Sequence, residues 1–105
     1  MNDIDNNKHF LHLLHKTHLF QKRALIDTAS LAQINILCEI ILNIITGIVE
    51  LDTELKEKFK RKRALLWTIL KRSTSKKRKQ LLLKKNIKLL DSFIEISLNI
   101  LEGNE

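Results

Sequence analysis

A run of isoleucine and leucine residues in the middle of the chain constrains its fold more than any other feature. Positions 34, 37, 41, 44 and 48 are all Ile or Leu, and these alternating steps of three and four residues place side chains on one face of an α-helix. Ile36, Ile40 and Ile45 widen that face. The remaining positions form a narrow polar stripe of Asn35, Glu39, Asn43 and Thr46. The pattern predicts a central helix, over about residues 30–46, that is buried on most sides.

The two ends of this helix carry their own signals. Ser30 and Gln33 have the spacing of a capping box, and Gly47 can adopt the left-handed conformation that ends a helix. The apolar stretch over residues 31–49 is long enough to span a bilayer, but Glu39 lies near its middle, where a carboxylate is costly. We therefore expect a buried helix in a soluble fold.

The composition extends the helical prediction to the whole chain. The 105 residues include no proline and only two glycines, and 44% are hydrophobic, which suits one domain with a modest core. No segment alternates with a period of two for long enough to be a strand. We expect an all-α, compact bundle of about four to six short helices around the central one, forming a single domain over residues 1–105. The polar residues 1–8 are expected to be disordered.

Capping residues and apolar spacing place the other helices. One short helix is expected around Phe10 to Leu14, and a second, of about ten residues, follows a cap at Thr17 or His18. Two further helices make a basic pair over about residues 52–86. The first begins at Asp52 or Thr53 and runs to about Arg72, and the second covers about Lys76 to Lys85. An amphipathic helix from Ile87 to Leu101 completes the chain.

Positive charge is concentrated in one part of the sequence. Residues 56–88 contain fifteen Lys or Arg and a single acid, Glu57, which gives +14, whereas the whole chain carries +7. The flanking segments are mildly acidic, at −3 for residues 1–55 and −4 for residues 89–105. A segment with this much unpaired charge favours a polyanionic partner, although a merely solvated surface is the alternative.

Two basic clusters lie on neighbouring predicted helices and could form one continuous surface. We expect the phosphate contacts from Lys60, Arg61, Lys62, Arg63, Lys71, Arg72, Lys76, Lys77, Arg78 and Lys79. Most of these residues are lysines, which contact phosphates without reading bases. Base contacts would need Arg61, Arg63, Arg78 or Gln80. The sequence therefore predicts binding of nucleic acid, double-stranded DNA in particular, without sequence specificity.

The same clusters match a two-part nuclear import signal, which would make an intracellular protein nuclear. No arrangement suggests catalysis, so we expect no enzyme and no cofactor. The four histidines recur every three residues, from His9 to His18, and on a helix they turn progressively away from one another. We therefore expect no metal site. The single cysteine, Cys38, is expected to pack in the core.

The central helix and the basic segment together resemble a small basic protein of Polinton or Maverick-type transposons and related adintovirus-like elements. The matching pattern, L-C-E-x-x-x-N-x-x-x-G, runs here from Leu37 to Gly47, and the similar region covers about Gln21 to Lys85. These elements encode adenovirus-like capsid genes, so the resemblance implies a role near DNA or the particle core and association with a virion. The chain departs from the family where Asn86 leads into an acidic helix instead of a Gly-Gly-Phe-Leu-type tail.

The sequence also allows two other kinds of binding partner. A helical interaction module would bind a partner helix, a second copy of the chain or an acidic surface. Its distinguishing feature would be an exposed apolar groove rimmed by Glu39 and Asn43. Binding of the basic, leucine-rich helices to an anionic membrane is the less favoured alternative.

Overall fold

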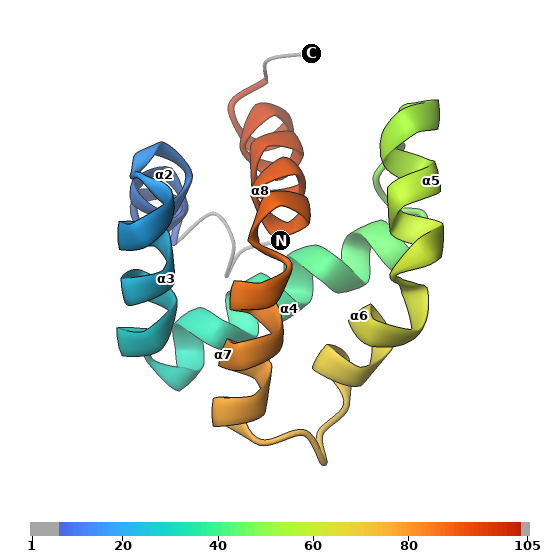
Figure 1. The fold of residues 1–105 in the computed structure, drawn as a ribbon. Helices are drawn as coiled ribbons and strands as arrows, with labels where there is room; N and C mark the ends of the chain where they lie inside the picture. Colours follow the sequence, from blue (N-terminus) through green and yellow to red (C-terminus); the bar gives the residue numbers. More distant parts are fainter. Residues whose placement is uncertain (1–6, 104–105) are drawn as a thin grey trace.

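The structure is a computed structural model that describes residues 7–103 (Figure 1). This part of the chain contains seven helices and no strand. They are α2 (Lys8–Lys16), α3 (Leu19–Thr28), α4 (Leu31–Ile45), α5 (Thr53–Arg61), α6 (Arg63–Leu70), α7 (Lys76–Lys85) and α8 (Ile87–Leu101). The all-α prediction is confirmed. The radius of gyration, 12.7 Å, is close to the ~13 Å expected for a compact domain of this length.

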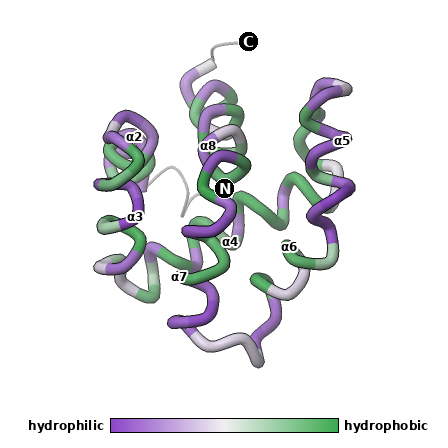
Figure 2. The backbone as a smooth tube through the Cα atoms, viewed as in Figure 1, coloured by the Kyte–Doolittle hydropathy of each residue, from purple (hydrophilic) through white to green (hydrophobic). Residues whose placement is uncertain are grey.

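The predicted central helix is α4, and its ends form as the sequence indicates. Ser30 Oγ accepts a hydrogen bond from Gln33 N–H, and the Gln33 side chain accepts one from Ser30 N–H. Gly47 has a φ of 80°. In Figure 1, α4 passes behind the junction of α7 and α8, and in Figure 2 its tube is predominantly hydrophobic. It packs against α6, α7 and α8, and seven of its fifteen residues are buried.

The core lies between α4 and the apolar sides of α2, α6, α7 and α8. Its fully buried side chains include Leu37 and Ile41 of α4, Ile69 of α6, and Phe93 and Ile94 of α8. Each buried side chain of this size contributes about 1.5–3 kcal/mol relative to an exposed one. The amphipathic helix predicted from Ile87 to Leu101 has the observed boundaries of α8.

The prediction of one continuous helix from about residue 52 to 72 is wrong, because two helices, α5 and α6, cover this segment. Asp52 caps it as expected, because its Oδ1 accepts a hydrogen bond from Leu55 N–H at 2.8 Å. The helix is broken at Lys62, which has a φ of −105° and a ψ of 8°, and α6 ends at Leu70. A continuous helix would place the like charges of Lys60 and Arg63 three residues apart on one face, which is destabilising. The break lets α6 bury Leu66 and Ile69, whereas no residue of α5 is fully buried.

The two short N-terminal helices lie where the sequence predicts them; α2 is longer than predicted, and α3 has the predicted length of about ten residues. Helix α2 extends from Lys8, beyond the predicted Phe10 to Leu14, and α3 follows His18, one of its two candidate caps. The prediction that residues 1–8 are disordered falls mainly on residues 1–6, which lie outside the described residues. Lys8 is the first residue of α2.

Asp91 of α8 joins α2 and α3 to the bundle. Its Oδ1 lies 2.7 Å from Lys22 Nζ and 2.8 Å from His15 Nδ1. Lys22 Nζ also donates a hydrogen bond to the His15 carbonyl oxygen at 2.8 Å. A second contact, 3.2 Å between His12 Nε2 and Glu102 Oε2, lies at the other end of α8. The regular histidine spacing thus serves, at two of its four positions, to attach α2 to α8.

Replacing Asp91 should loosen this attachment. The Lys22 side chain is only 11% exposed, so Asp91→Ala would leave a mostly buried ammonium group without its carboxylate. Because Asp91 itself is partly exposed, we expect a loss of about 1–3 kcal/mol in the free energy of unfolding, measured by urea denaturation. Glu95→Ala removes an exposed acid of the same helix and is the control, with an expected change within about 0.5 kcal/mol. Equal losses in both variants would contradict this role for Asp91.

Candidate nucleic-acid interface

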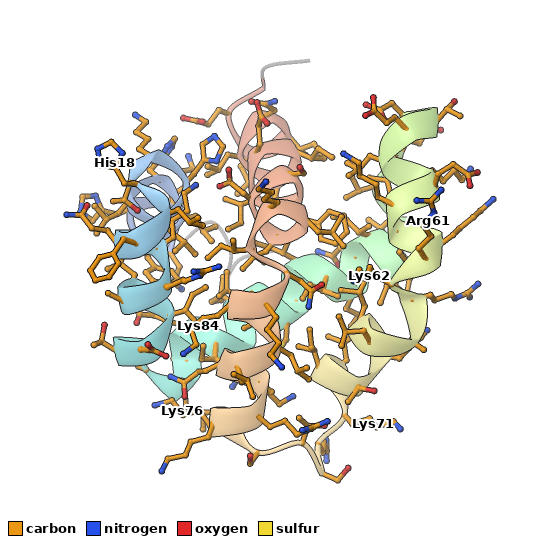
Figure 3. All side chains as sticks on the ribbon, in the orientation of Figure 1. His18, Arg61, Lys62, Lys71, Lys76 and Lys84 are labelled. Atoms are coloured by element: carbon orange, nitrogen blue, oxygen red, sulfur yellow. The ribbon has the colours of Figure 1, made fainter. Side chains whose placement is uncertain are left out.

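The turn between α6 and α7 fixes the relation between the two basic clusters. The Thr74 side chain is buried, and its Oγ1 donates a hydrogen bond to the Thr68 carbonyl oxygen at 2.6 Å. Ser75 caps α7, because its Oγ accepts a hydrogen bond from Arg78 N–H at 3.2 Å. Helices α6 and α7 also pack against each other. Figure 3 shows Lys71 and Lys76 at the same end of the molecule, with Arg61 and Lys62 at the break between α5 and α6.

Nine of the ten predicted phosphate-contacting residues are exposed, and Lys79 is the exception. Its side chain is half-buried, and its Nζ donates a hydrogen bond to the Ile69 carbonyl oxygen at the end of α6. Lys60 lies 3.8 Å from Glu57, but both groups are well exposed, and such pairs contribute little. The remaining eight have no ion pair among the described residues.

A groove of about 500 Å³ lies between the α5–α6 break and the junction of α7 with α8, and α3 also contributes to it. Leu19, Ile87 and Leu89 supply its apolar lining. Its charged lining consists of six cations and no acid: Arg23, Lys58, Arg61, Lys62, Lys85 and Lys88. Among these six, only Lys58 has an ion pair within the described part of the chain, an exposed contact of 3.7 Å with Glu54.

Sequence reasoning identified only two of these groove cations, Arg61 and Lys62, as site residues. Lys58, Lys85 and Lys88 belong to the basic segment but lie outside its dense clusters. Their contribution could have been suspected from the total charge of residues 56–88. Arg23 comes from the acidic N-terminal segment, and no sequence signal connects it with the others. Packing of α3 beside α7 brings it into the groove.

Part of the polar surface of α7 is used to hold the fold together. Gln80 is buried, and its Nε2 donates hydrogen bonds to the carbonyl oxygens of Ile26, at 2.9 Å, and Asp27, at 3.1 Å. Lys84 Nζ lies 2.6 Å from Asp27 Oδ1, and Figure 3 shows Lys84 between α7 and α3. These contacts satisfy the end of α3. The suggestion that Gln80 could contact bases is therefore wrong.

The charge changes sign along the cleft between α5 and α8. A second cavity, of about 260 Å³, adjoins the groove, and Lys58 and Ser92 line both. Asp52, Glu54 and Glu95 also line this second cavity. The basic groove therefore ends at an acidic cavity.

The polar residues of α4 do not form a site. Asn43 is buried, so it cannot rim an exposed groove as the interaction-module alternative would need. Burial raises the pKa of the Cys38 thiol above its ordinary value, although the charge of Lys79 acts in the opposite direction. In the described part of the chain, no group of three or more His, Cys, Asp or Glu could hold a metal ion.

Within residues 7–103 no single helix is long and apolar enough to cross a membrane; α3 and α4 pass that test only together, and they are bent by 117°. No protein-family model, curated protein or solved structure matches the chain. The resemblance to transposon proteins stays a prediction.

Proposed function

We propose that this helical bundle binds DNA without sequence specificity and acts as a DNA-packaging or core protein of a virus-like element. The observation that carries this proposal is the number of exposed cations on α5, α6, α7 and the turn between α6 and α7, most of which have no carboxylate partner among the described residues. Phosphates could neutralise these cations and release condensed counterions from DNA. Binding of DNA would also reduce the electrostatic repulsion between these cations.

The chemistry of the exposed groups favours backbone contacts over base contacts. Lysines predominate, and a lysine ammonium binds phosphate as a point charge. Gln80 is unavailable because it is buried and hydrogen-bonded to α3. Arg61, Arg63 and Arg78 are exposed, but they lie on different helices and present no common edge of hydrogen-bond donors to a groove of DNA.

The dependence of affinity on salt tests the proposal. If about six to eight cations contact phosphates, log affinity should fall with log salt concentration at a slope of about −5 to −7. The measurement is a titration of labelled duplexes of unrelated sequence at several salt concentrations, with an acidic polymer as competitor. Equal affinities for the duplexes are expected. A slope near zero would rule out the electrostatic mechanism.

A protein-interaction function is the second candidate, and a specific surface supports it. An apolar groove of about 280 Å³ lies between α2 and α3, lined by Leu13, Thr17, Gln21, Ala24, Leu25 and Thr28. Phe20, on the same helix α3, is 84% exposed. Exposed apolar surface of this kind is typical of binding sites. Absence of binding to every duplex at low salt would favour this function over DNA binding.

A further inference from the structure

Five of the six cations of the basic groove are not paired with a carboxylate in the described part of the chain. Arg23, Arg61, Lys62, Lys85 and Lys88 line the groove, and none of them has an ion pair among the described residues. They come from α3, α5, the α5–α6 break, α7 and α8. The fold therefore brings together charges that are distant in the sequence. Such a focus of positive potential attracts an anionic group strongly.

The size and lining of the groove limit what the anion can be. A volume of about 500 Å³ is within the range of small-molecule sites, so a duplex can only lie across its mouth. A group the size of one nucleotide can enter. The leucine and isoleucine side chains on the lining, from Leu19, Ile87 and Leu89, offer an apolar surface for a sugar or a base beside the phosphate.

The acidic cavity beyond Lys58 limits how a strand can continue. A polyanionic strand running along the α5–α8 cleft would pass from the basic groove to the carboxylates of Asp52, Glu54 and Glu95, which repel phosphates. A strand that ends in the groove avoids this repulsion. A terminal phosphate monoester also carries up to about two negative charges at neutral pH, more than a backbone diester.

We propose that the groove binds the terminal phosphate of a nucleic-acid strand, so that the protein prefers strand ends to continuous strands. This inference rests on the proposed function, because the exposed clusters would hold the adjoining DNA. The unpaired groove cations, Arg61 and Lys88 among them, contact the terminal phosphate, and the acidic cavity prevents the strand from passing through.

The test compares one single-stranded sequence in three forms: linear with a terminal phosphate, linear without it, and covalently closed into a circle. Affinities are measured by fluorescence anisotropy at fixed salt. We expect the phosphorylated linear strand to bind about tenfold more tightly than the circle, as suits charge-assisted hydrogen bonds to one added anion. The double variant Arg61→Ala with Lys88→Ala should bind the phosphorylated strand and the circle equally.

Two matched variants make the result specific to the groove. Lys76→Ala with Lys77→Ala also removes two charges, but from exposed positions of α7 outside the groove lining, and it should weaken binding of all three forms equally. Glu54→Gln with Glu95→Gln removes two carboxylates of the acidic cavity and should narrow the difference between linear and circular strands. A preference for ends that survives in the Arg61 and Lys88 variant overturns the inference.

The outcomes also separate this inference from the proposed function. If the circle and the phosphorylated strand bind equally well with a steep salt dependence, the preference for ends is wrong and DNA binding stands. If no form binds at low salt, the preference for ends is wrong, and the duplex titrations decide the proposed function separately.

Discussion

Replacing Phe93 by alanine is expected to lower the free energy of unfolding by about 3–5 kcal/mol. The Phe93 side chain has no exposed surface. It lies where four helices meet, beside Ile41 of α4, Leu66 of α6 and Leu83 of α7, around an existing void of only about 10 Å³. The truncation would leave a cavity that rigid neighbouring helices cannot fill. Against a total stability of about 5–15 kcal/mol for a typical domain, this loss is large.

The measurement is thermal unfolding followed by circular dichroism, where a loss of this size corresponds to a decrease of roughly 20 °C in Tm. Phe20→Ala provides a control with the same change in chemistry, because Phe20 is 84% exposed. Its expected effect is within about 0.5 kcal/mol. If the two variants lost similar stability, the buried core around Phe93 would not be the main source of stability.

The features of the fold that could be predicted are those decided locally. Ser30 caps α4 as predicted, and Asp52, one of two predicted candidates, caps α5, because a serine or aspartate before a helix satisfies N–H groups only a few residues away. Gly47, just after the end of α4, was also predictable, because it has a positive φ that is unfavourable for other residues. The apolar face of α4 was also predictable, because apolar residues at steps of three and four lie on one face of a helix.

The rest depends on contacts between distant parts of the chain. The break at Lys62 accompanies the packing of α6 against α4 and α7, which the spacing of apolar residues in the sequence does not show. Lys77 and Lys79 look equivalent in sequence, yet Lys77 is exposed and Lys79 donates to the carbonyl oxygen of Ile69. Arg23 joins the groove only because α3 packs beside α7. A candidate phosphate-binding residue is therefore defined by whether the fold leaves its charge unpaired, which the sequence does not record.

This distinction predicts that two pairs of α7 lysines will have opposite effects. Lys76→Ala with Lys77→Ala removes exposed cations, so the magnitude of the salt slope for DNA binding should fall by about two. Affinity should decrease about tenfold at low salt. Thermal stability should stay within about 0.5 kcal/mol of the parent, because neither side chain has an ion pair among the described residues.

Lys79→Ala with Lys84→Ala removes the same number of charges from the same helix. Lys79 bonds to the Ile69 carbonyl oxygen and Lys84 pairs with Asp27, so this variant should lose about 1–2 kcal/mol of stability. Its salt slope should equal that of the parent protein, because neither lysine is free to contact phosphate. Slope and stability are measured on both variants in one buffer series. If the two slopes decreased equally, net charge alone, and not the arrangement of free cations, would determine DNA binding.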